Sequence, residues 1–207
     1  MRLVHRPALA GALLLALSLI HALHPRQAAA QGRWSCQAEF FAGEPVAAAE
    51  FSDGWNYGLG LGGGVARAFG SRFEIGLAGD FVQFKLADIP DAAESGGQRR
   101  FSRLEVPLRV LAWEHNGFHR LQVVVQAGAG YVHESIDPIS GGIAPGRPFR
   151  SDGNTYEGSL WLSRLFYQRT RWFVGGRLTH LDLPDHKPEY WTFHIGARMP
   201  LEGSRPR

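Results

Sequence analysis

The sequence predicts an all-β protein: an eight-stranded antiparallel up-and-down transmembrane β-barrel, preceded by a cleaved signal peptide. Three observations lead to this fold class. The chain begins with a short apolar segment, apolar and polar residues then alternate at every second position, and the connections between the alternating segments are long and short in turn. We therefore divide the chain into a signal peptide, residues 1–30, and one barrel domain, residues 31–207.

The signal peptide is predicted from its three parts. Residues 8–23 are almost wholly apolar, Arg2 and Arg6 precede them, and the small residues 28–30 fit a cleavage site. The apolar run is short for a transmembrane helix, so an uncleaved anchor is the weaker alternative. Because three of the 22 basic residues lie in this segment, 19 remain to balance the 19 acidic residues. A balanced barrel has no overall basic character for binding nucleic acid.

Strands are predicted from alternation at period two. In residues 101–113, Leu104 and Val106 fall on one face, and Arg103 and Glu105 fall on the other. The same alternation recurs along the chain. It predicts eight strands, at about 34–42, 54–69, 72–87, 100–114, 119–134, 154–168, 171–182 and 190–201.

The connections give the topology. Four are long and rich in Pro, Gly, Asp and Ser: residues 43–53, 88–99, 135–153 and 183–189. Three are tight turns: residues 70–71, 115–118 and 169–170. Outer-membrane barrels have short periplasmic turns and long outer loops, so this rhythm places both ends of the barrel domain on the periplasmic side.

The composition of the two faces indicates a membrane. Large aromatic residues near strand ends suit the two membrane interfaces, and we assign to them Trp55, Tyr57, Trp113, Tyr131, Trp172 and Trp191. Arginine and acidic residues on the other face suit a closed lumen, where charges must pair. The predicted lumen charges are Glu74, Asp80, Arg103, Glu105, Arg109, Glu157, Arg177 and Arg198, together with Glu39. A soluble periplasmic barrel with an apolar interior is the alternative.

Three stretches carry a family resemblance. Residues 51–64 (FSDGWNYGLGLGGG), 104–108 (LEVPL) and 125–131 (VQAGAGY) resemble the outer-membrane β-barrel domain family, which includes the OmpA-like and OmpX-like eight-stranded barrels. This resemblance covers nearly all of residues 34–201. It implies the fold and a location in the outer membrane, and it implies no activity.

No catalytic, cofactor-binding or metal-binding residue is expected. The histidines are scattered, and no Cys/His cluster has metal-ligand spacing. The segment around His180, with Glu189 further on, resembles the end of outer-membrane lipid A deacylases, which place a serine two residues after the histidine. That position is Asp182 here, so the histidine-activated serine mechanism lacks its nucleophile.

The leading hypothesis is therefore a monomeric, non-enzymatic outer-membrane protein with a structural or surface-interaction role. Its partners are outer-membrane lipid and an external ligand or protein at residues 88–99 and 135–153. An eight-stranded barrel leaves room only for side chains, so we expect the charges to plug the lumen. The alternatives are a porin-like conduit for small solutes or hydrophobic molecules, and a lipid A-modifying esterase.

Overall fold

The computed structural model describes residues 34–47, 55–86, 98–115, 120–136, 149–167 and 170–201. They form eight strands: β1 Trp34–Ala47, β2 Trp55–Phe69, β3 Phe73–Leu86, β4 Gln98–His115, β5 Leu121–Ile136, β6 Phe149–Tyr167, β7 Thr170–Asp182 and β8 Glu189–Pro200. None of these described residues belongs to a helix long and apolar enough to cross a membrane. The predicted signal peptide lies outside the described residues.

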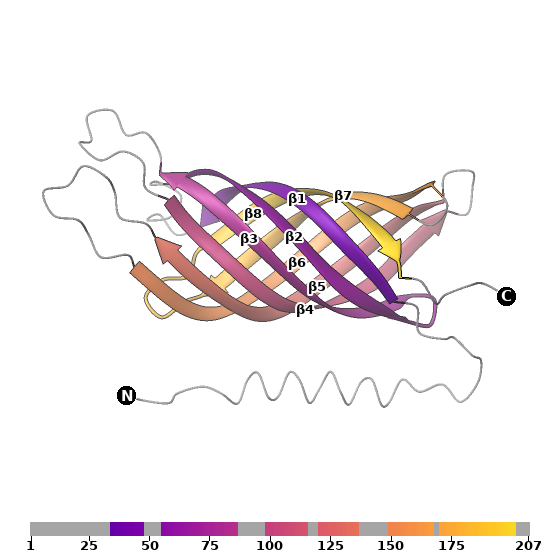
Figure 1. Cartoon of the computed structure of the whole chain (residues 1–207), viewed down its shortest axis with the longest axis horizontal. Helices are drawn as coiled ribbons and strands as arrows, with labels where there is room; N and C mark the ends of the chain where they lie inside the picture. Colours follow the sequence, from indigo (N-terminus) through magenta and orange to yellow (C-terminus); the bar gives the residue numbers. More distant parts are fainter. Residues whose placement is uncertain are drawn as a thin grey trace, which may run out of the picture. The chain divides into compact units, whose positions relative to one another are not determined.

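The eight strands close into one antiparallel barrel (Figure 1). Each strand pairs with its neighbour in the chain, and β8 returns to pair with β1 from Ser35 opposite Pro200 to Ala47 opposite Glu189. Closure leaves no strand edge unpaired. The predicted fold class, strand number and up-and-down order are confirmed.

Several strands extend further into the long connections than the sequence predicted. β1 continues to Ala47, β5 to Ile136, and β6 begins at Phe149. Parts of the predicted loops, residues 43–47, 98–99, 135–136 and 149–153, are therefore strand. The reason for the longer β1 is its pairing: its alternating pattern is weak, but it pairs with β2 as far as Gly43 and with β8 as far as Ala47. The remaining parts of loops 88–99 and 135–153 lie outside the described residues.

The apolar face of the barrel points outward. Phe40, Leu61, Leu104, Leu160 and Phe193 are between 54% and 69% exposed, and they belong to five different strands. Contiguous apolar surface of this extent is not left in water by a soluble monomer, whereas a membrane barrel presents such a band to lipid. The alternative of a soluble barrel with the apolar face inside is therefore wrong.

Exposed aromatic side chains lie toward both ends of the apolar band. Trp113 and Trp172 are near the short turns, and Tyr57, Tyr131 and Trp191 are near the long loops, each about half exposed. The side chain of Trp55 lies outside the described part of the chain. Strict alternation from Arg103 would turn Trp113 inward, but an irregularity in the β4–β5 register between Leu111 and Trp113 turns it outward.

Glycines on one strand make room in the narrow interior. The sequence places four of them at alternate positions of β2: Gly58, Gly60, Gly62 and Gly64. A Cβ at Gly58 would lie 2.7 Å from the Phe84 ring, and one at Gly60 would meet the Phe41 ring. These inward glycines therefore leave room for bulky neighbours across the barrel.

Candidate functional site: the barrel interior

The interior of the barrel is lined by charged side chains. All of the predicted lumen charges point into it: Glu39, Glu74, Asp80, Arg103, Glu105, Arg109, Glu157, Arg177 and Arg198. Each points inward because every second residue of a strand faces the lumen, and each charge falls in the same alternating series as the buried positions of its strand. The side chains form four successive layers. From the short turns to the long loops, these are a polar layer, a central charged network, an apolar cluster and an ion pair.

Arg177 on β7 is the centre of the charged network. Its Nη2 lies 2.8 Å from Glu39 Oε1 on β1, its Nη1 2.8 Å from Asp80 Oδ2 on β3, and its Nε 3.0 Å from Glu157 Oε2 on β6. Arg177 is 1% exposed. One guanidinium group therefore ties together four strands across the lumen. It does so through charge-assisted hydrogen bonds to Glu39 and Asp80 and an ion pair with Glu157.

Arg103 on β4 is the second cation of the network. It forms a two-point contact with Asp80, with 2.8 Å between Nε and Oδ1 and a second bond from Nη2 to Oδ2. Its Nη1 donates to Thr179 Oγ1 at 3.1 Å and Thr155 Oγ1 at 3.4 Å. Asp80 is thus shared by both arginines, which makes the network one connected unit.

Carboxyl groups outnumber guanidinium groups in this central layer. Arg103 and Arg177 face the four acids Glu39, Asp80, Glu105 and Glu157. The nearest cation to Glu105 is Arg103, at 3.9 Å, and Glu105 Oε2 is buried without a hydrogen bond. The middle of the lumen is therefore locally acidic.

Toward the short turns, the polar chain continues through Arg109. Its Nε donates to Gln126 Oε1 at 2.6 Å, and Gln126 in turn donates to Glu157 in the central layer. The Arg109 guanidinium lies 4.9 Å from the centre of the Trp161 ring, which stacks on Phe173 at 4.8 Å. This layer thus combines a cation–π contact with an aromatic stack.

Arg198 on β8 closes the network at the same end. Its Nη2 lies 2.6 Å from Glu74 Oε1, and its Nε donates to Ser35 Oγ at 3.0 Å. Arg109 approaches the other oxygen of Glu74 at 3.9 Å. Glu74 is therefore held mainly by Arg198 and only loosely by Arg109.

Toward the long loops, apolar side chains fill the lumen. They form one buried cluster: Phe41, Val82, Phe84, Phe101, Val132, Leu181, Leu183 and Tyr190. The rings of Phe84 and Tyr190 pack edge to face at 5.3 Å between centres. Leu183 belongs to the β7–β8 connection, and its N–H donates to the His186 carbonyl at 3.2 Å, so this connection folds over the cluster.

An ion pair lies beyond the apolar cluster. Arg99 Nε is 2.5 Å from Glu134 Oε1, and His186 Nε2 is 3.0 Å from the other oxygen of Glu134. Glu134 is completely buried. From the Trp161–Phe173 stack to Glu134, the lumen is therefore filled by side chains.

Sequence reasoning missed part of this interior. It identified neither the Arg99–Glu134 pair nor the buried His194, whose Nδ1 lies 3.2 Å from Glu39 Oε2. It also missed the apolar layers. Phe101 lies an even number of residues from the inward charge Arg103, and Trp161 lies an even number from Glu157. This spacing places both rings on the inward face, and it is the signal that could have revealed them.

The exterior carries the histidine considered for lipid chemistry. His180 Nδ1 lies 2.7 Å from Glu189 Oε1 on the neighbouring strand, and both side chains are about one-third exposed. Asp182, at the position of the missing serine, lies 3.1 Å from Lys187 Nζ. Among the described residues, no group of three or more His, Cys, Asp or Glu side chains could hold a metal ion.

A closed eight-stranded barrel with an apolar exterior, aromatic side chains toward both ends and a charged interior is a small outer-membrane β-barrel. No family model matches the chain, and no curated protein matches it by sequence.

Comparison with solved structures gives matches to barrels of this class. Neisserial surface protein A superposes with a TM-score of 0.59 at 12% identity, over 81% of this chain and 97% of that chain. The attachment invasion locus protein Ail of Yersinia pestis gives a TM-score of 0.46 at 13% identity, over 81% and 99%. The N-terminal barrel of Pseudomonas aeruginosa OprF gives 0.44 at 16% identity, over 82% and 100%. The first of these likenesses shows a shared fold.

Proposed function

We propose that this protein is a monomeric outer-membrane barrel with a closed lumen, which acts structurally or through surface contacts made by its long loops. A single observation carries the proposal. Arg177 is fully buried and bound by carboxylates from β1, β3 and β6, so its guanidinium lies across the lumen. Eight strands enclose an interior only wide enough for side chains, and such a crossing leaves no continuous water path.

The surrounding layers support the same reading. The cluster containing Phe84 and Tyr190 lies on one side of the charged network, and the Trp161–Phe173 stack lies on the other. A conduit for solutes would need these apolar layers and the ion pairs between them to move together. The side chains of each layer pack against strands that are hydrogen-bonded to a neighbour on both sides. This close packing opposes such movement.

Conductance is the test of the closed lumen. Purified protein reconstituted into a planar bilayer should give no current steps above those of the empty bilayer, whereas a porin in the same bilayer gives clear steps. Regular conductance steps from this protein would overturn the proposal and favour the small-solute conduit.

We assign the external contact to the long loops. Residues 88–97 lie between β3 and β4 in the chain, and residues 137–148 lie between β5 and β6. Because every strand edge is paired inside one chain, the barrel has no edge to offer a second copy, which supports a monomer.

A complementation experiment separates the structural role from the surface role. Cells lacking the protein receive either the full chain or a variant with both loop segments shortened, and outer-membrane leakage of a hydrophobic fluorescent dye is measured. Restoration by both chains supports a structural role. Restoration by the full chain alone supports a role for the loops. Wild-type leakage in cells lacking the protein would contradict a structural role.

A lipid-modifying esterase is the second candidate, and the His180–Glu189 contact at 2.7 Å is the observation that favours it. Asp182 supplies no hydroxyl nucleophile, so we propose that the protein is not an enzyme of this type. Incubation of the reconstituted barrel with lipid A, followed by mass spectrometry, should detect no released acyl chain. Release that disappears in His180→Ala would establish the esterase instead.

A further inference from the structure

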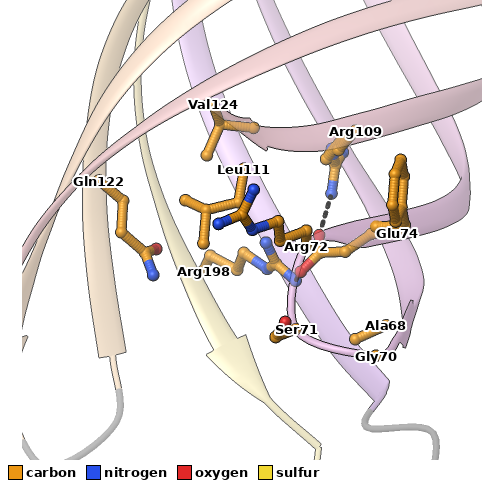
Figure 2. A pocket seen from close by; sticks show the side chains of 11 residues that line it. Ala68, Gly70, Ser71, Arg72, Glu74, Arg109, Leu111, Gln122, Val124 and Arg198 are labelled. Atoms are coloured by element: carbon orange, nitrogen blue, oxygen red, sulfur yellow. Dashed lines mark hydrogen bonds and ion pairs between the residues drawn. The ribbon is translucent and has the colours of Figure 1, made fainter. Parts of the chain in front are cut away.

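A pocket of about 70 Å³ lies in the barrel interior at the short-turn end (Figure 2). Its walls come from the end of β2, the β2–β3 turn, the beginnings of β3 and β5, and the ends of β4 and β8. The short-turn end of an outer-membrane barrel faces the periplasm. The pocket is therefore placed to receive a ligand from that compartment.

The charge of the pocket is strongly positive. Arg72, Arg109 and Arg198 line it, and Glu74 is the single acid among its lining residues. Figure 2 shows the three arginines converging on the pocket, with the Glu74 carboxyl group beside Arg109 and Arg198. With three guanidinium groups and one carboxylate, the lining residues carry a net charge of +2.

The guanidinium groups retain unused donors. Arg198 directs Nε and Nη2 to Ser35 and Glu74, and Arg109 directs Nε to Gln126. Among the described residues, the Arg72 guanidinium forms neither an ion pair nor a hydrogen bond. The backbone of Arg72 is fixed nevertheless, because its carbonyl accepts a hydrogen bond of 2.8 Å from the Leu111 N–H of β4.

The inner wall of the pocket is apolar. Leu111 and Val124 line it, and Val124 belongs to the buried cluster of Trp161 and Phe173. Apolar walls lower the local dielectric constant and strengthen the attraction between an anion and the arginines. The same cluster lies between the pocket and the acidic centre of the lumen, and it keeps an anion in the pocket at a distance from Glu157 and its neighbours.

We propose that this pocket binds a phosphate group, either free phosphate or the end of a phosphomonoester. A cavity of this volume has room for roughly five water molecules, which is sufficient for one tetrahedral oxyanion. Two uncompensated charges match a phosphate dianion better than a monocarboxylate. The flat guanidinium groups provide paired N–H donors that fit phosphate oxygens.

The test is calorimetric titration of the full-length barrel in zwitterionic micelles with inorganic phosphate, glycerol 3-phosphate and acetate, at constant ionic strength. Phosphate or glycerol 3-phosphate should bind with 1:1 stoichiometry, at least about tenfold more tightly than acetate. The tighter of the two phosphates identifies the source of the ligand. Equal binding of all three anions, or no binding, would overturn the proposal.

Two variants and one control locate the site. Arg72→Gln should weaken phosphate binding about tenfold without unfolding the barrel, because Arg72 is exposed in a turn. Ala68→Leu fills the pocket from its inward position without changing charge, and it should also weaken binding. The control is Arg67→Gln, which removes the same charge from the exposed outer face of β2. If Arg67→Gln weakens binding as much as Arg72→Gln, the interaction is non-specific screening and the pocket is not the site.

Discussion

Arg177 on β7 and Glu39 on β1 are 138 residues apart in the chain, and their side chains meet at 2.8 Å in the centre of the lumen. Both are at most 3% exposed. The contact can form only after the barrel has closed, because β1 and β7 are held on either side of β8. It therefore links the closure of the barrel to the packing of its interior.

Replacing Arg177 by methionine should destabilise the barrel more than any other single change in the network. The substitution leaves Glu39, Asp80 and Glu157 without their shared cation, and breaking a buried ion pair in this way costs about 3–5 kcal/mol. Urea unfolding in lipid vesicles, followed by tryptophan fluorescence, measures the loss.

Arg67→Met is the matched control for this change, because Arg67 is an exposed arginine on the outer face of β2. It should lower the free energy of unfolding by under about 1 kcal/mol. A second substitution, Glu39→Gln, should restore part of the stability lost in Arg177→Met. Equal losses in the two arginine variants would show that the central network does not stabilise the barrel.

Arg109→Ala should have a smaller effect than Arg177→Met. Glu74 keeps its contact with Arg198 at 2.6 Å, so the main consequence is an unpaired Gln126 carbonyl and an uncovered Trp161 ring. Loss of such a hydrogen bond costs about 1–3 kcal/mol, and the same urea titration measures it. A loss as large as that of Arg177→Met would mean that Glu74 depends on Arg109 despite the 3.9 Å separation.

Arginine on the outer face should be tolerated only near the rim. Leu61 lies within the apolar band, and Leu61→Arg should cost about 2–4 kcal/mol because the charge enters hydrocarbon. Val46 is also outward and exposed but lies near the loop end of β1, and Val46→Arg should cost at most about 1 kcal/mol. Folding equilibria in vesicles compare the two. Equal values would contradict a lipid-facing exterior.

The inward glycines of β2 should not accept a methyl group. A Cβ at Gly60 would meet both the Phe41 ring and the Phe81 carbonyl, so Gly60→Ala should lower stability by about 1–3 kcal/mol. Gly158→Ala is the control, because a Cβ there has nothing within 4 Å. The heat-dependent mobility shift on gels, measured against temperature, ranks both variants. Equal tolerance would show that the interior near Phe41 is not tightly packed.

Alternation and loop rhythm were sufficient to predict the architecture. A β-strand turns successive side chains to opposite faces, so the sequence alone indicates which face of the strand Leu104 and Arg103 occupy, whatever the partner strand. Loop length likewise distinguishes the two ends of the barrel. For this reason the eight strands, their order and the outward direction of the apolar face all followed from local pattern.

Partners across the lumen were decided by the tertiary structure alone. The meeting of Arg177 with Glu39 depends on strand stagger, which spacing along the chain does not encode. The turning of Trp113 to the outer face depends on an irregular register between β4 and β5. The sequence by itself determined which residues face inward. Only closure of the barrel decided which of them touch, because a closed cylinder brings together strands that are distant in the chain.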